Sequence, residues 1–117
     1  MSYIGTRSLT ATIAINTALS DAVELNGADV IRFSMPAAWT AADITFQVSD
    51  DGGITFRDLY MEWGFELGMW VDADMSIETS VFLQLKRIDQ IKIRSGTSGA
   101  PVNQTAERLI LLEVGAK

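Results

Sequence analysis

The sequence predicts an all-β fold, a single-domain antiparallel β-sandwich of jelly-roll-like type that spans residues 1–117 and holds about seven or eight short strands. Three observations support this fold class. Apolar and polar residues alternate with a period of two in several segments. Turn-forming residues follow these segments at intervals of roughly 8–12 residues. No segment shows the i, i+3, i+4 spacing of apolar residues that marks an amphipathic helix.

The first two strands are expected at residues 8–15 and from about Ala22 to Leu25. The first places Leu9 and every second residue to Ile15 on one face, with threonines on the other. Asn26-Gly27 follows the second strand and predicts a type I′ turn, because both central residues of that turn need positive φ.

The third strand is expected at residues 30–35, and its core face would hold Ile31, Phe33 and Met35. Pro36 ends this strand because proline cannot donate a backbone hydrogen bond. Residues 37–43 form a connector that is too short for a packed helix, and Trp39 within it is expected to fill the core.

A β-hairpin is expected over residues 44–60, with Asp51, Gly52 and Gly53 as its loop. Residues directly opposite each other on antiparallel strands point to the same face, so core residues must pair with core residues, which places Val48 opposite Phe56. The same register would bury Asp58, and an unpaired buried carboxylate is costly. We therefore expect a bulge at residues 57–58 that turns Leu59 inward instead.

The remaining strands are expected around residues 67–71, at Ile77, at residues 91–94 and at residues 108–114, with a loop at residues 72–74. Residues 81–85 fit either a strand or a single helical turn. The last strand is apolar on both faces, which predicts a central position in a sheet or cover on both sides. Residues 95–104 form a loop that we expect to contact a neighbouring subunit.

Composition excludes several classes of function. The chain has no Cys and no His, so it has no disulfide, no thiolate zinc site and no Ser-His type of triad. Fifteen acidic residues against nine basic ones give a net charge of −6, which argues against a nucleic-acid partner. No apolar run is long enough to span a membrane, and the N-terminus lacks the apolar core of a signal peptide. We expect synthesis in a cytoplasm, no secretion, no cofactor and no catalysis.

Two acidic clusters were considered as sites. Residues 50–53 could supply oxygen ligands to Ca²⁺, but their spacing is not that of an EF-hand, and turn formation is the preferred interpretation. Asp72 and Asp74 could be a carboxylate pair for glycoside hydrolysis, but nothing places them across a cleft, and solvation in a loop is preferred. No metal ligand and no catalytic residue is assigned.

The candidate interface lies in an aromatic-rich segment near the middle of the chain. Large apolar side chains there alternate with Gly64, Glu66 and Gly68, which suggests a surface that is apolar on more than one face. Core packing is the equally weighted alternative. The candidate interface residues are Trp63, Phe65, Leu67, Met69 and Trp70.

Two segments resemble a group of small structural proteins encoded by tailed bacteriophages and prophages. They are PAAWTAADITFQVSDDGGITFRDLY and IRSGTSGAPVNQTAERLI, and the resemblance covers residues 31–112, although residues 61–77 depart from the pattern. The matching residues are Pro36, Trp39, Thr40, Phe46, Gln47, Ser49, Asp51, Gly52, Phe56, Leu59, Tyr60, Arg94, Ser95, Gly96, Thr97, Pro101, Gln104 and Arg108.

The resemblance implies a non-enzymatic virion component, such as a capsid decoration protein, the base of a head fibre or a tail accessory protein. Its expected partners are the major capsid protein or another virion protein, together with further copies of itself, and a trimer is one option. A carbohydrate-binding β-sandwich that stacks sugars on tryptophan is the alternative.

Overall fold

The computed structural model describes residues 6–79 and 85–115, and within these ranges it holds nine strands in two antiparallel sheets and no helix. The strands are β1 (Thr6–Ile13), β2 (Val23–Glu24), β3 (Asp29–Ser34), β4 (Ile44–Ser49), β5 (Arg57–Asp58), β6 (Gly68–Met69), β7 (Ser76–Glu78), β8 (Gln90–Ser95) and β9 (Arg108–Gly115).

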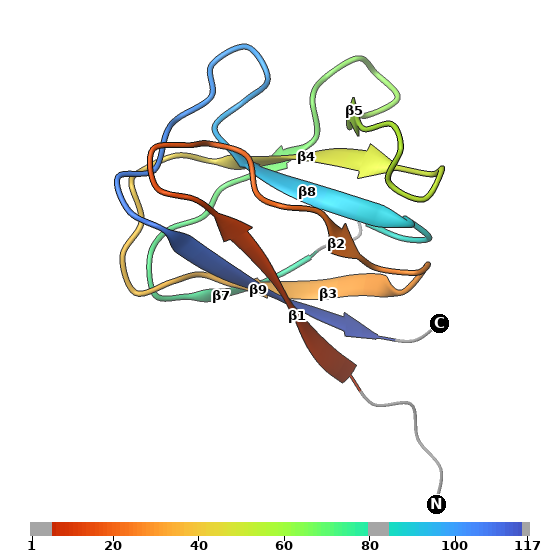
Figure 1. Ribbon diagram of the computed structural model, residues 1–117, viewed down its shortest axis with the longest axis horizontal. Coiled ribbons are helices and arrows are strands. Elements are labelled where there is room, and N and C mark those ends of the chain that lie inside the picture. The colour runs from red at the N-terminus through yellow and green to blue at the C-terminus, as the bar shows by residue number, and fades with distance from the viewer. Residues whose placement is uncertain (1–5, 80–84, 116–117) are drawn as a thin grey trace, which may run out of the picture.

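The two sheets face each other as the layers of a sandwich (Figure 1). One sheet has the order β1-β9-β3-β7, and the other has the order β2-β8-β4-β5, with β6 also on β4. β5 pairs with residues 47–48 of β4 and β6 with residues 44–45, while β8 pairs with β4 along its whole length. β5 and β6 therefore fill one interrupted position at the edge of the sheet. Counted this way, the eight positions are arranged in the orders 1-8-3-6 and 2-7-4-5 in the two sheets, as in a jelly roll, which confirms the predicted fold class.

The core lies between the inner faces of the two sheets, where strands contribute every second side chain. Phe33 from one sheet stacks on Phe46 from the other, with ring centroids 5.7 Å apart. Around this pair lie the largest fully buried aliphatic side chains, Ile13, Leu25, Ile44, Leu85, Ile91, Ile93, Ile110, Leu112 and Val114. Trp39 is half-buried against the core, as the sequence predicted.

Local signals in the first half of the chain were mostly correct. Asn26 and Gly27 both have positive φ, at 51° and 80°, so the predicted turn forms. The prediction of Ile31 on the core face was wrong, because the pairing of β3 with β9 shifts between Val30 and Arg32. This irregularity buries Val30 and leaves Ile31 half-buried.

The predicted hairpin forms, but its register differs by one residue. Val48 lies opposite Arg57 rather than Phe56, and Gln47 lies opposite Asp58. The connecting loop is longer than expected and spans residues 50–56. Asp58 therefore lies on the outer face of its sheet without a bulge, and Leu59 packs against the core as predicted.

The second half of the chain follows the predicted order of strands. Residues 72–74 form a loop, Ile77 lies in β7, and residues 91–94 lie in β8. β9 is central in its sheet, between β1 and β3. Its outer face is not covered within the described residues, because Leu109 and Leu111 remain exposed there. The segment at residues 81–84 lies outside the described residues.

Candidate interaction surface

A short hairpin interrupts the edge position shared by β5 and β6. The amide of Leu67 donates to the carbonyl of Leu59, Tyr60 bridges to Glu66, and the amide of Met61 donates to the carbonyl of Phe65. Gly64 closes the tip with a φ of 90°, a conformation that glycine adopts without steric cost. We refer to residues 59–67 as the aromatic hairpin.

The structure separates the five predicted interface residues into two groups. Trp63, Phe65 and Trp70 are 75%, 67% and 62% exposed. Leu67 is buried in the core and Met69 packs partly against it, so both support the hairpin from below. Tyr60, which sequence reasoning did not include, is also exposed. Exposed aromatic side chains of this number are unusual on a small domain, because aromatic residues are enriched at interfaces and in cores.

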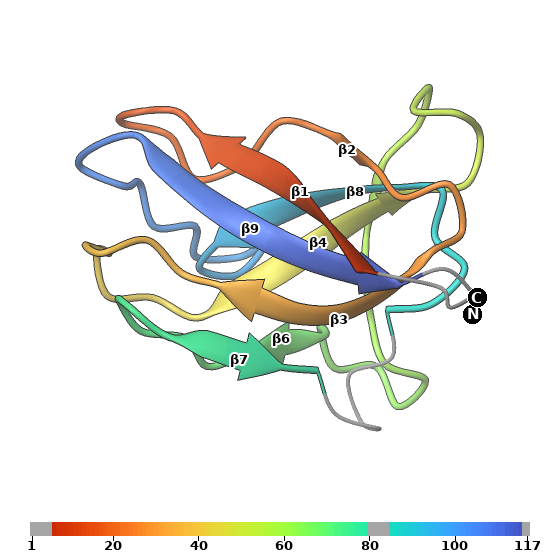
Figure 2. The same ribbon diagram turned by 90° about the horizontal axis from the view of Figure 1, so that it is seen from below.

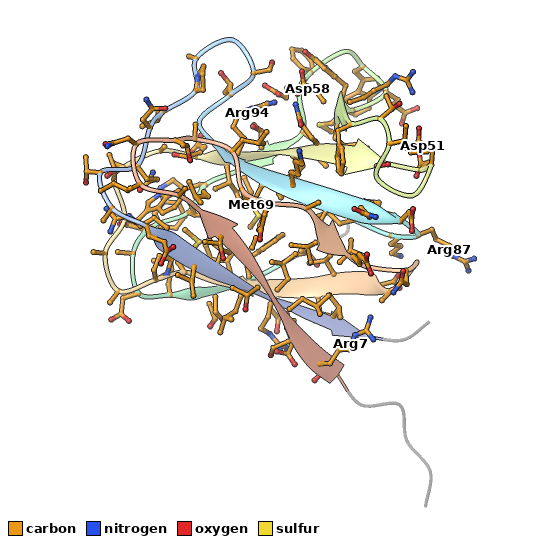
Figure 3. All side chains as sticks on the ribbon, viewed as in Figure 1. Arg7, Asp51, Asp58, Met69, Arg87 and Arg94 are labelled. Carbon is orange, nitrogen blue, oxygen red and sulfur yellow. The ribbon has the colours of Figure 1, made fainter. Side chains whose placement is uncertain are left out.

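Arg94 braces the aromatic hairpin against the outer face of the β2-β8-β4-β5 sheet. Its guanidinium donates to the carboxylate of Asp58 through Nη2 and to Glu66 through Nη1, the latter at 3.0 Å. Figure 3 shows Arg94 and Asp58 reaching toward each other from that face. The Arg94 side chain is only 8% exposed, so this is a largely buried ion-pair network. The network links the hairpin to β5 and β8.

The same network joins a second loop to the hairpin. The carboxylate of Glu66 accepts a hydrogen bond from the amide of Ser98, at 3.0 Å. Figure 1 shows the two loops that this contact joins rising on the same side of the sandwich. The hydrogen bond from Arg94 holds the pKa of Asp58 below its ordinary value, so the carboxylate stays ionised in the folded protein. The hairpin is therefore held at its base and along its side.

Several residues on which the resemblance to phage proteins rests are buried or tightly packed and have structural roles. Gln104 is fully buried, and its amide nitrogen donates to the Thr40 carbonyl and to Ser95 Oγ. Its Oε1 accepts from the Thr40 amide and from Arg108 Nε. Gly96 has a φ of 86°, and a side chain there would meet the Ala100 carbonyl oxygen. These residues connect the loops at one end of the sandwich.

The loop at residues 50–56 is organised by Asp51, as the preferred sequence interpretation predicted. Asp51 Oδ1 accepts hydrogen bonds from the amides of Ile54 and Thr55 and from Ser49 Oγ. These bonds lower the pKa of Asp51 from 3.8 to about 2, with the Thr55 amide as the largest cause. All three hydrogen bonds to Asp51 Oδ1 come from residues of the turn itself or beside it.

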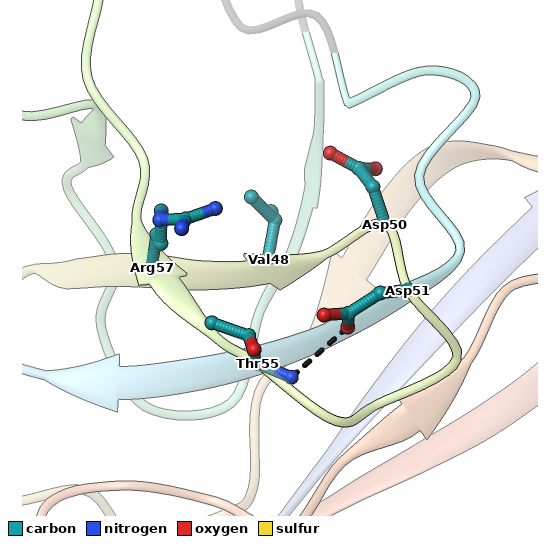
Figure 4. Close-up of a pocket in the computed structure, with 5 residues that line it drawn as sticks. All are labelled: Val48, Asp50, Asp51, Thr55 and Arg57. Carbon is teal, nitrogen blue, oxygen red and sulfur yellow. Dashed lines mark hydrogen bonds between the residues drawn. The ribbon is translucent and has the colours of Figure 1, made fainter.

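A hollow beside this loop is lined by Val48, Asp50, Asp51, Thr55 and Arg57 (Figure 4). Its volume is about 160 Å³. Pockets that bind small molecules typically measure roughly 300–1,000 Å³, so this hollow is small for a ligand site.

The other acidic candidates lie on an exposed loop. Asp72 and Asp74 are both exposed on the loop before β7, where Asp72 accepts a hydrogen bond from the Ala73 amide. Within the described residues, no three acidic side chains gather closely enough to hold a metal ion. The same part of the chain contains no helix long and apolar enough to cross a membrane.

Sequence reasoning missed the Arg94 network because its members come from three separate segments. One signal was present. Arg94 lies on the polar side of the alternation in residues 91–94, and Asp58 is the carboxylate for which an unpaired buried position was expected to be costly. Pairing these two would have identified the brace.

Comparison with known proteins supports the fold. No protein-family model matches the chain, and no curated protein matches it significantly. A crystal structure of the SPBc2 prophage-derived protein YomS superposes with a TM-score of 0.61, covering 99% of this chain and 97% of that one at 12% identity. A structure from Bacillus endospore appendages, described as disulfide-linked pili, covers 99% and 93% at 14% identity, but its TM-score is only 0.40. The chain therefore shares its fold with a prophage-derived protein.

Proposed function

We propose that this chain is a non-enzymatic structural protein of a bacteriophage virion, which docks on the capsid through the aromatic hairpin and Trp70. The main supporting observation is that Trp63, Phe65 and Trp70 are each more than 60% exposed while the segment beneath them is fixed. A rigid surface loses little conformational entropy on binding, so more of the contact energy becomes affinity.

The size of this surface supports docking in many copies. The three exposed side chains offer several hundred Å² of apolar area, since an aromatic residue buries about 150–250 Å². At about 25 cal/mol per Å², that area yields roughly 10 kcal/mol at most. Association costs about 4–15 kcal/mol, so one hairpin alone binds weakly. Several hairpins joined in one oligomer would bind a symmetric particle much more tightly, because each further contact is intramolecular.

A virion location draws support from two further sources. The motif residues described above resemble phage structural proteins, and YomS, which has the same fold, comes from a prophage. Jelly rolls are also frequent in viral capsids, an analogy of fold that does not by itself assign function. The expected partner is the major capsid protein or another virion protein.

Binding to particles tests this proposal. Purified chain is mixed with particles from the phage or prophage that encodes it, made without the endogenous copy, and the bound fraction is measured after sedimentation. Trp63→Ala and Trp70→Ala should each reduce binding by roughly tenfold or more, while the unfolding free energy changes by less than about 0.5 kcal/mol for these exposed sites.

Ile54→Ala is a matched control, because Ile54 is 85% exposed on a different loop. This variant should bind like the wild type. Wild-type chain that does not sediment with particles, or tryptophan variants that bind normally, would contradict the proposal. A large fall in melting temperature with binding intact would assign Trp70 to stability instead.

Carbohydrate binding is the second candidate, because Trp63 and Trp70 expose rings on which a sugar could stack. This function predicts a change in tryptophan fluorescence on adding glycans and positive signals on a glycan array. Trp63→Ala would abolish both, without any need for virus particles.

A further inference from the structure

β1 is the longest strand at a sheet edge in the described part of the molecule, and its outer edge is free. Figure 2 shows β1 at the margin of its sheet, beside β9. β1 has eight residues, whereas β2, β5 and β6 have two each and β7 has three. Proteins usually protect sheet edges with short strands, prolines or bulges. β1 has none of these, since its register against β9 is continuous from Thr6 to Ile13.

The outward backbone groups of β1 have hydrogen-bond partners at the Thr12 end of the strand and are open at the Thr6 end. The amide of Thr12 donates to Asp21 Oδ1, and the carbonyl of Thr12 accepts from the Asp21 amide. Thr12 therefore directs its backbone groups away from β9. Since backbone direction alternates along an antiparallel strand, Thr10, Ser8 and Thr6 direct theirs the same way. No partner for these groups occurs among the described residues.

We infer that the open half of β1 pairs antiparallel with β1 of a second copy, which joins the two four-stranded sheets across a two-fold axis at Ser8. Centring on Ser8 pairs Ser8 with Ser8 and Thr6 with Thr10. Each of these three pairs exchanges two backbone hydrogen bonds. Centring on Thr10 instead would require Thr12, which Asp21 already occupies.

The side chains of this register are self-complementary. Arg7 is the one charged residue of the open segment, and it would face Leu9 of the other copy rather than another Arg7. Facing threonines are favourable cross-strand neighbours on a sheet. Two-fold dimers built from one self-complementary patch are the commonest homo-oligomers. The hairpin proposed to dock on capsids belongs to the other sheet, so the two contacts involve different surfaces.

Ser8→Pro tests the inference in the full-length chain. Proline removes the outward amide of Ser8 but no intramolecular backbone bond, because edge strands tolerate proline where the N–H faces solvent. Ser8→Ala is the matched control, since it also loses the Ser8 Oγ hydrogen bond to Glu113 yet keeps the amide. Mass is measured by sedimentation equilibrium over roughly a hundredfold range of concentration.

Wild type and Ser8→Ala should reach twice the monomer mass of 12.8 kDa, and Ser8→Pro should stay monomeric. At concentrations low enough for both variants to be monomers, Ser8→Pro and Ser8→Ala should melt at the same temperature. In the wild-type dimer, amide exchange at Thr10 should be roughly tenfold or more slower than in Ser8→Pro. A monomeric wild type, a trimer, or a dimer that survives Ser8→Pro would overturn the inference. So would a dimer with no added protection at Thr10.

Discussion

Replacing Arg94 with methionine should destabilise the protein and loosen the aromatic hairpin. The change keeps most of the side-chain volume but leaves Asp58 and Glu66 without their cation. Breaking a buried ion pair on one side typically costs about 3–5 kcal/mol. The Asp58 side chain is 31% exposed and can regain some hydration, so we expect a loss of about 2–4 kcal/mol.

Urea unfolding followed by tryptophan fluorescence measures this loss at neutral pH. Arg32→Met is the matched control, because the Arg32–Glu78 pair is exposed at 37% and 74% and should contribute less than about 1 kcal/mol. The triple variant Arg94→Met, Asp58→Asn, Glu66→Gln removes every charge of the network. It should recover at least half of the lost stability, because no carboxylate is then left unpaired.

Amide exchange gives an independent result. In Arg94→Met, the amides of Met61 and Leu67 should exchange faster than in the wild type, while those of β9 should follow only the change in global stability. A loss no larger than that of Arg32→Met would refute the reasoning. A triple variant as unstable as Arg94→Met would refute the role assigned to the unpaired carboxylates.

Two further predictions concern backbone and pH. Gly96→Ala should cost roughly 2–4 kcal/mol, because φ is 86° and the new Cβ would lie 2.5 Å from the Ala100 carbonyl oxygen. Gly52 has a similar φ of 76°, but a Cβ there would meet open space, so Gly52→Ala should lower the free energy of unfolding by only about 1–2 kcal/mol in thermal or urea unfolding. Equal losses in the two variants would show that the contact at Gly96 is unimportant. The pKa of Asp51 falls from 3.8 to about 2 on folding, so its contribution is complete above pH 3.8 and disappears as the pH falls toward 2. Asp51→Asn should flatten this part of the profile of urea midpoint against pH, and a variant profile parallel to that of the wild type would contradict the assignment.

Local sequence signals predicted much of the fold because they depend on neighbouring residues. Asn26-Gly27 determines its turn through its own φ angles, and the parity of Ile44 and Phe46 places them in the core whatever lies around them. The register of the hairpin was harder to predict. Its loop is held by Ser49 and Asp51 and by Asp89, whose carboxylate accepts from the Gly52 amide. That last contact comes from 37 residues away and leaves no local pattern.

The candidate site was predictable in composition but not in arrangement. An aromatic-rich segment was visible, yet the alternation alone could not separate exposed Trp63 from buried Leu67. That distinction depends on the hairpin that Arg94 holds in place through contacts 28 and 36 residues away. The burial of Gln104, with its four hydrogen bonds, likewise depends on where two distant loops meet.

The interrupted edge position has a consequence for how this domain can diversify. The two ends of the excursion meet at the Leu59–Leu67 hydrogen bond of 2.9 Å, so the residues between them close on themselves. Their number and identity can change while β4, β8 and the core keep their contacts, since loop closure costs little for added length. The scaffold thus tolerates exchange of residues 60–65 as a cassette, provided that Glu66 is kept as a partner of Arg94, and variants with new sequences there would acquire new specificities on an unaltered sandwich.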